Sequence, residues 1–282
     1  MPATEELKAI VSQMPDRDKN GTYVNMDKEK SDQIEKAVSE LQKGGRDSVL
    51  GLIDLLVEPG QGDDIKPHFA LHLLAVRMTG LGDDKARGEF ALALASQVGG
   101  GRPKGVQKYL VQELQVAGGK EVVETLGKAL LDPDLCDDAA RALAAIRDGA
   151  AGELLAALPK VQGKSRLSVI KKLAVLRAEK AGDAFKQALA DGDPDIRIAA
   201  AWGITRIADA SAADALLKAA DAAQGWERIN ETDACLALAD GLVAAGKKDA
   251  AAGLYAHLAK TRTDASERHT REAAERGLAA SK

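Results

Sequence analysis

Apolar residues recur three and four positions apart along most of this chain, which is the spacing that gathers them on one face of an α-helix. From residue 119 onward, short amphipathic stretches alternate with longer ones, and between 31 and 118 the same periodicity indicates further helix pairs. Asp132 and Asp193 each precede a proline and are expected to cap the helix that follows. The pattern therefore predicts an all-α protein of antiparallel helix pairs joined by tight turns.

The helical pattern also repeats along the chain. Residues 132–146 align with 193–207 at an offset of 61 residues, which corresponds to two units of about thirty. Between these stretches, Leu173 falls at the place of Ile204. A helix pair of this length cannot bury its apolar stripe alone, so the pattern predicts a solenoid in which each repeat is stabilised by its neighbours.

The stretch at 190–219, ADGDPDIRIAAAWGITRIADASAADALLKA, resembles the HEAT repeats, particularly the short HEAT-like repeats named after phycobilisome lyases. The shared features are an Asp, a Pro-Asp turn, an Ile-Arg pair, an Ala-Ala step and a closing apolar-Ala-Asp. The resemblance implies a right-handed α-solenoid of antiparallel helix pairs that is continuous over 31–282. It consists of degenerate pairs at 31–118 and HEAT-like repeats with a C-terminal cap at 119–282, after a polar N-terminal segment at 1–30.

The family's paired Asp and Arg match Asp191 and Arg197 in this stretch. On the same alignment the arginine position holds Cys136, Arg166 and Cys235 in other repeats, which predicts that a ladder of paired side chains is interrupted. The two cysteines then lie about three repeats apart, too far for a disulfide. Both are expected to be small buried residues.

Composition and charge narrow the classes of partner. The chain is 45% hydrophobic but only 3% aromatic, which favours close helix packing. Residues 1–60 carry eight basic and twelve acidic side chains, and the remainder carries 31 of each sign, so no general excess of positive charge favours nucleic acid. The chain contains no run of about twenty apolar residues, so no membrane-spanning helix is predicted. The sequence reads as cytoplasmic, and a secreted form without its leader is the alternative.

Trp202 lies in the middle of an alanine-rich helix. On a helical wheel it falls about 120° from the centre of the apolar face, so it is a flanking residue. Lys171 and Asp240 take the equivalent places in neighbouring repeats. Two interpretations stay open: the indole packs against the next helix pair, or it faces a partner on the concave side.

Trp226 falls in the stretch DAAQGWERINETD, where the repeat is about seven residues longer than its neighbours. We expect this insertion to be a loop between two helices, and inserted loops in solenoids often lie on the binding face. Trp226 and Arg228 are therefore candidates for partner recognition. The alternative is a loop that is anchored by burying its own indole.

Residues 16–27, DRDKNGTYVNMD, fit the template of a calcium-binding loop. The candidate ligands are Asp16, Asp18, Asn20 and Asp27. An Asp in place of the usual bidentate Glu, and Val24 at the ninth position, both weaken the match. The alternative is a polar loop with an Asn-Gly turn.

His68 and His72 lie four residues apart on a predicted helix, a spacing that is able to bind a metal from one face. The only further candidate ligands nearby in sequence are Asp63 and Asp64. We therefore expect His68 and His72 to be ordinary core or surface residues and not metal ligands. HEAT-like deoxyhypusine hydroxylases bind iron through His-Glu dipeptides, and no histidine of this chain is followed by Glu.

These observations predict a non-catalytic HEAT-like scaffold that binds a protein or peptide partner in a curved groove, with no catalytic residue and no cofactor. Two alternatives belong to other classes. The chain is either the accessory helical region of a larger enzyme, or an enzyme like the HEAT-like lyases and glycosylases. The oligomeric state stays open.

Overall fold

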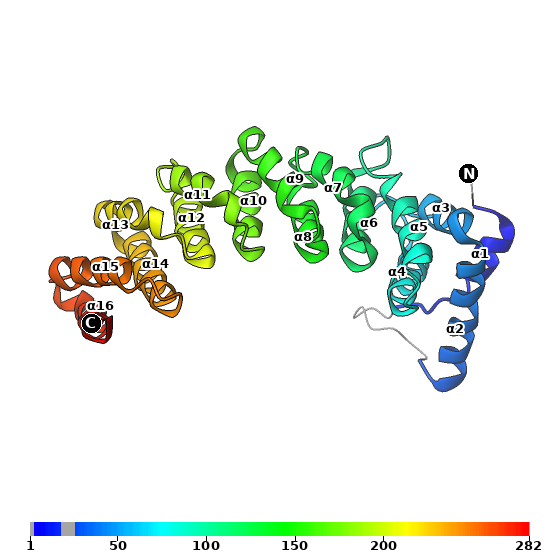
Figure 1. Ribbon diagram of the computed structural model, residues 1–282. Helices are drawn as coiled ribbons and strands as arrows, with labels where there is room; N and C mark the ends of the chain where they lie inside the picture. The colour runs from blue at the N-terminus through cyan, green and yellow to red at the C-terminus, as the bar shows by residue number, and fades with distance from the viewer. Residues whose placement is uncertain (1–2, 18–25, 282) are drawn as a thin grey trace. The chain divides into compact units, whose positions relative to one another are not determined.

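The computed structural model describes residues 3–17 and 26–281, which form helices and no β-strand (Figure 1). The prediction of an all-α protein is therefore confirmed. The chain divides into two compact units, Met1–Glu153 and Leu154–Lys282. Helix α9 (Ala150–Ala157) spans the boundary between them.

Unit 1 is a stack of helix pairs. Helices α2, α4, α6 and α8 pack in sequence in one layer, and α3, α5 and α7 each pack on the helix that follows. The short α1 packs on α2, α3 and α4 and buries Leu7 and Val11, so part of the expected polar N-terminal segment belongs to the core of this unit. The bounds are α1 (Glu5–Val11), α2 (Lys28–Lys43), α3 (Gly45–Asp54), α4 (Ile65–Gly80), α5 (Asp84–Ala95), α6 (Lys104–Ala117), α7 (Val123–Ala129) and α8 (Cys136–Ile146).

Unit 2 has the same two-layer arrangement, as expected for an α-solenoid. Helices α10, α12, α14 and α16 pack in sequence in one layer, while α11, α13 and α15 each pack on the helix that follows (Figure 1). The bounds are α10 (Gly163–Val175), α11 (Gly182–Ala188), α12 (Pro194–Ile207), α13 (Ala213–Ala222), α14 (Gly225–Ala244), α15 (Lys248–Thr261) and α16 (Arg268–Ser281). A 3-10 turn, η5 (Ala265–Glu267), leads into α16.

Two glycines allow the helices of a pair in unit 2 to approach closely. A methyl group on Gly203 of α12 would lie 2.6 Å from the ring of Phe185 on α11. On Gly277 of α16 it would lie 2.4 Å from the ring of Tyr255 on α15. Both aromatic rings are buried, so the few large side chains of this chain pack directly on a bare helix backbone.

The two Asp-Pro boundaries differ in the structure. Asp193 caps α12 as predicted, because its side chain accepts a hydrogen bond from the backbone N–H of Asp195 at 2.9 Å and Pro194 begins the helix. Asp132 accepts from Asp134 N–H at 3.0 Å, but α8 begins only at Cys136. The second cap was therefore predicted wrongly, because Asp132 stabilises a turn before the helix and not the helix itself.

An arginine ladder joins successive repeats in unit 2. Arg166, Arg197 and Arg228 each lie at the fourth residue of α10, α12 and α14, and they are spaced 31 residues apart. Each guanidinium pairs with a carboxylate that lies in the first turn of the next helix of the same layer or just before that helix. It also donates to a backbone carbonyl in the last turns of the preceding helix or just after it. The carboxylates are Asp191, Glu227 and Glu267, and the carbonyls are those of Leu158, Asp191 and Ala220.

This ladder corrects the sequence alignment. Arg228, not Cys235, is the third arginine of the series, so the ladder is continuous through unit 2. Helix α14 has 20 residues where α12 has 14, and because both have their arginine at the fourth position, the extra residues lie at the C-terminal end of α14. Cys235 then takes the buried core position of Leu173 and Ile204. Both cysteines are free and buried, as predicted.

The same register shows an unusual residue in the core. Glu231 is fully buried and takes the position of Val169 in α10 and Ala200 in α12, both of which are also fully buried. Among the described residues, neither carboxylate oxygen of Glu231 has a hydrogen-bond partner. Burial raises the pKa of Glu231 to about 7, with a further contribution from the neighbouring Glu227 carboxylate. An apolar position of the repeat is thus occupied by a group that holds its proton near neutral pH.

We expect Arg197→Ala to lower the free energy of unfolding of unit 2 by about 2 kcal/mol, because it leaves Glu227 without its partner beside Glu231. Both tryptophans lie in unit 2, so denaturant unfolding followed by tryptophan fluorescence reports on this unit. The matched control is Arg268→Ala, which removes an exposed pair with Glu272 at 3.7 Å and should change stability by less than about 0.5 kcal/mol. Equal effects of the two variants would contradict a stabilising ladder.

The buried Glu231 carboxyl should make the parent protein less stable as the pH rises, and we expect Glu231→Gln to remove this loss. The folded pKa of Glu231 is about 7 and the ordinary value is 4.5, so the folded protein keeps a proton that the unfolded chain releases. Stability from this group is complete below about pH 4.5 and falls as the pH rises through 7. Relative to the parent, the variant should therefore gain roughly 3 kcal/mol between pH 4 and pH 8.

The measurement is denaturant unfolding by tryptophan fluorescence across that pH range. Glu275→Gln, on an exposed residue of α16, is the control and should show no such gain. A difference between Glu231→Gln and the parent that does not change with pH would show that the Glu231 carboxyl titrates normally.

Candidate functional site: a groove with two tryptophans

One face of unit 2 carries a groove of about 610 Å³ that crosses helices α10, α12 and α14. We call it the tryptophan groove. Its polar and aromatic lining includes Lys171, Lys172, Asp195, Trp202, Trp226 and Asp233. Both tryptophans of the chain therefore line one groove, although they are 24 residues apart in the sequence.

Trp202 lies in the third turn of α12 with 40% of its surface exposed. The Arg206 guanidinium, one turn further along the helix, is 5.8 Å from the centre of the indole ring, within the range of a cation–π contact. The indole is thus flanked and oriented by its own helix while a large part of it faces the groove. Trp202, which the helical wheel placed beside the apolar face, therefore lines the tryptophan groove.

Trp226 lies in the first turn of α14 and is 71% exposed. The prediction of an inserted loop is wrong, because helix α14 begins at Gly225 and the extra length of the repeat is at the other end of this helix. The alternative of an anchored loop is wrong too, since the indole is not buried. Asn230 donates to the Trp226 carbonyl at 2.8 Å and is itself part of the groove.

The repeat register explains how the groove is built. Lys171, Trp202 and Asp233 are equivalent residues, each five positions after the arginine of its helix. Asp195 and Trp226 are likewise equivalent, each two positions before it. The same position of the repeat therefore presents a cation on α10, an indole on α12 and a carboxylate on α14. The groove is basic where α10 lines it and acidic and aromatic where α12 and α14 do.

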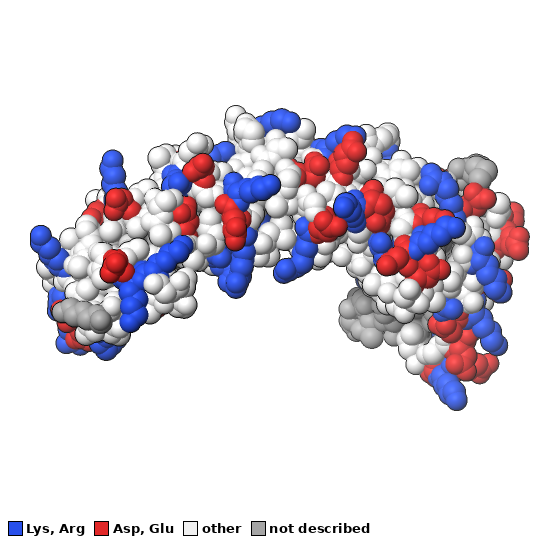
Figure 2. Space-filling model, in the orientation of Figure 1, with Lys and Arg blue, Asp and Glu red and all other residues white. Residues whose placement is uncertain are grey.

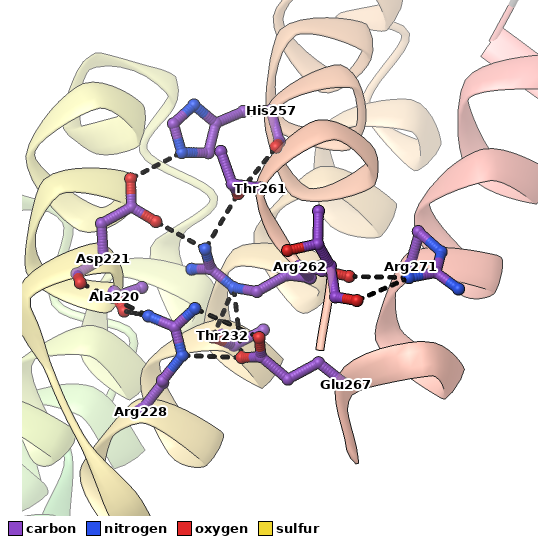
Figure 3. A network of polar contacts seen from close by, with 10 residues as sticks. Ala220, Asp221, Arg228, Thr232, His257, Thr261, Arg262, Glu267 and Arg271 are labelled. Carbon is purple, nitrogen blue, oxygen red and sulfur yellow. Dashed lines mark hydrogen bonds and ion pairs between the residues drawn. The ribbon is translucent and has the colours of Figure 1, made fainter. Parts of the chain in front are cut away.

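Arg228 does not line the tryptophan groove. Its guanidinium donates to Glu267 at 2.6 and 3.2 Å and to the Ala220 carbonyl at 3.1 Å (Figure 3). The hydrogen bond to Glu267 raises the pKa of Arg228, and that from Arg228 lowers the pKa of Glu267. Arg228, predicted with Trp226 as a recognition residue, is therefore committed to the arginine ladder.

The ladder extends into a polar network at the end of unit 2 (Figure 3). The fully buried Arg262 donates to Asp221 at 2.5 Å and to Thr232 at 3.3 Å, and His257 lies 2.7 Å from the second Asp221 oxygen. Burial opposes ionisation of Asp221, but the hydrogen bonds from Arg262 and His257 prevail and lower its pKa. These charges neutralise one another, and their geometry ties α13, α14 and α15 together.

The proposed calcium ligands are only partly within the described residues. Asp27 caps α2 by accepting from Lys30 N–H at 2.8 Å, and Asp16 lies 3.4 Å from the Lys66 ammonium. Asp18 and Asn20 lie outside the residues that the structure describes. In the described ranges, no three His, Cys, Asp or Glu side chains form a group able to hold a metal ion. Calcium binding stays a prediction.

The charge distribution bears on the class of partner. Basic and acidic side chains are interspersed over the face of each unit that Figure 2 shows. Within residues 3–17 and 26–281, no helix is long and apolar enough to cross a bilayer. The sequence pointed to Trp202 and Trp226 and correctly placed Lys171 at the position of Trp202, but its other equivalent, Asp240, was wrong, because the register of the arginines puts Asp233 there. Lys172 and Asp195 were not singled out.

No protein-family model matches the chain, and no curated protein matches it. Among solved structures, it is similar to an engineered protein at 19% identity, covering 98% of this chain and 78% of that one with a TM-score of 0.49. A complex of CpcE and CpcF of phycocyanin lyase from a Nostoc species gives 16% identity, covering 83% and 94%, and a TM-score of 0.40. Kap121p bound to Nup53p gives 15%, covering 100% and 36%, and a TM-score of 0.47.

The phycocyanin lyase and Kap121p, which is a karyopherin, are HEAT-repeat proteins, the class that the 190–219 motif resembles. At these identities and TM-scores, the likeness assigns neither an activity nor a partner to this chain.

Proposed function

We propose that this chain is a non-catalytic scaffold that binds an extended segment of a partner protein in the tryptophan groove. One observation carries the proposal: the only two tryptophans in a chain with 3% aromatic residues line a single groove and are 40% and 71% exposed. Large aromatic side chains are the residues most often responsible for binding energy at protein interfaces.

The fold itself does not require either indole. The position of Trp202 is occupied by Lys171 in α10 and Asp233 in α14, and that of Trp226 is occupied by Asp195 in α12. A site that accepts a lysine or an aspartate has no need of an aromatic ring for packing. The exposed indoles therefore cost free energy in water unless a partner covers them.

The charges around the indoles favour a partner of particular chemistry. Asp195 precedes Trp202 by two turns on α12, and Asp233 follows Trp226 by two turns on α14, so each indole shares its helix face with a carboxylate. A lysine or arginine side chain of the partner is able to stack on an indole and reach a carboxylate. At the α10 edge, Lys171 and Lys172 favour an acidic residue. We therefore propose a peptide with a basic residue toward α12 and α14 and an acidic one toward α10.

Peptide selection tests this proposal without a known partner. Twelve-residue peptides displayed on phage are selected on the parent chain and counter-selected on a Trp202→Ala/Trp226→Ala double variant. We expect enriched peptides to contain Lys or Arg, and Trp226→Ala to weaken the best of them at least about tenfold. The control is Leu131→Ala, which removes a side chain of 47% exposure in unit 1 and should leave affinity unchanged.

Two outcomes of the selection would contradict binding in the tryptophan groove. Peptides that bind the double variant as well as the parent, with folding verified by circular dichroism, would place the binding surface elsewhere. A failure to enrich any peptide on the parent would contradict peptide recognition by the tryptophan groove.

A second prediction concerns the two carboxylates. The double variant Asp195→Asn/Asp233→Asn should bind a selected basic peptide about tenfold more weakly at low salt. The reason is that the cation of the peptide then meets neutral amides of the same shape. Fluorescence titration of the tryptophans at two salt concentrations measures this effect. Unchanged affinity and unchanged salt dependence would show that the carboxylates do not contact the peptide.

A further inference from the structure

Unit 1 contains a second cavity, of about 580 Å³, between α4 and α6. His68 and His72 of α4 both line it, one turn apart on the same helix face, and Tyr109 and Glu113 line it from α6. Neither the arginine ladder nor the tryptophan groove uses these residues, because both of those features belong to unit 2.

Each imidazole is held by an acceptor at the same ring nitrogen. His72 Nδ1 lies 3.1 and 3.2 Å from the two carboxylate oxygens of Glu113. His68 Nδ1 lies 3.0 Å from the Asp64 carbonyl and 3.2 Å from an Asp64 carboxylate oxygen. Because the partners are acceptor oxygens, Nδ1 carries the proton in both neutral rings, and the Nε2 lone pair is left for another ligand.

The surroundings make this arrangement rigid. The Glu113 side chain is only 4% exposed. The Tyr109 hydroxyl donates to the His68 carbonyl at 2.6 Å, and its ring lies 4.1 Å from the His68 ring, centre to centre. In the described part of the chain, neither Nε2 atom has a hydrogen-bond partner. The structure thus fixes the tautomer and the tilt of two imidazoles, and both rings make their hydrogen bonds to described residues through Nδ1 alone.

This is the outer-shell arrangement found at metal sites, where a ligating histidine donates its other ring N–H to a carboxylate or carbonyl. Two histidines four residues apart on one helix face are able to share a metal ion. Asp64 and Glu113 place two carboxyl groups behind the rings, on the side away from the cavity nitrogens, and the Arg17 guanidinium also lines the cavity. Imidazole nitrogen favours ions such as Zn²⁺, Ni²⁺ and Cu²⁺ over Mg²⁺.

We infer that His68 and His72 form an open two-imidazole site for a divalent transition metal ion, oriented by Asp64 and Glu113. The protein supplies two ligands, since the described residues contain no group of three. Water or a ligand in the cavity completes the coordination. The site is independent of the proposed peptide binding in unit 2.

Calorimetric titration of the full chain with Zn²⁺ near neutral pH, in a buffer that does not chelate metals, tests the inference. We expect one equivalent to bind the parent, with at least tenfold weaker binding after His68→Ala or His72→Ala. Glu113→Gln should weaken binding by roughly tenfold, as loss of an outer-shell partner does at known sites. His269→Ala, on an exposed histidine of α16, and titration with Mg²⁺ on the parent are the controls.

Nitrogen NMR of the parent tests the same inference without any substitution. Before zinc is added, His68 and His72 should both show the tautomer protonated at Nδ1, and zinc should shift the Nε2 signals of both. Zinc binding that survives in a His68→Ala/His72→Ala double variant would overturn the inference. So would the absence of binding to the parent, full affinity in Glu113→Gln, or a shift of only one of the two histidines.

Discussion

The arginine ladder is the interaction on which the described geometry of unit 2 depends. Each of its three arginines joins the end of one helix to the beginning of a helix in the next repeat, through a carboxylate and a backbone carbonyl. Because the bonds are partly shielded from water and each guanidinium uses several donors at once, the ladder fixes both the spacing and the rotation of α10, α12 and α14. Apolar packing alone is less directional.

A fixed register separates the positions that build the fold from those that are free to vary. Three and seven positions after each arginine, the side chain is fully buried, whether it is Val169, Ala200 or Cys235. Five positions after it, the side chain faces the groove, and lysine, tryptophan and aspartate are all accepted there. Glu231 is the exception among the buried positions, and its raised pKa is the cost of placing a carboxyl in an apolar register.

Local patterns predicted much of this structure, and its long-range geometry was predicted less well. Helical periodicity gave the all-α class and the repeat, and the Asp193-Pro194 cap followed from its own chemistry. The alignment failed around Trp226 because it matched Trp202 with Asp240, whereas the structure extends α14 at its C-terminal end and places Asp233 there. Trp226 was correctly singled out but placed in a loop. The orientation of His72 depends on Glu113, 41 residues further along the chain, which no local pattern indicates.

We propose that the two indoles act together as one binding surface. A double-mutant cycle on the peptide that binds most tightly tests it directly, by comparing affinities for the parent, Trp202→Ala, Trp226→Ala and the double variant. If one ligand spans both rings, the two effects should be coupled by at least about 0.5 kcal/mol. Purely additive effects, or an effect at one tryptophan only, would contradict a shared groove.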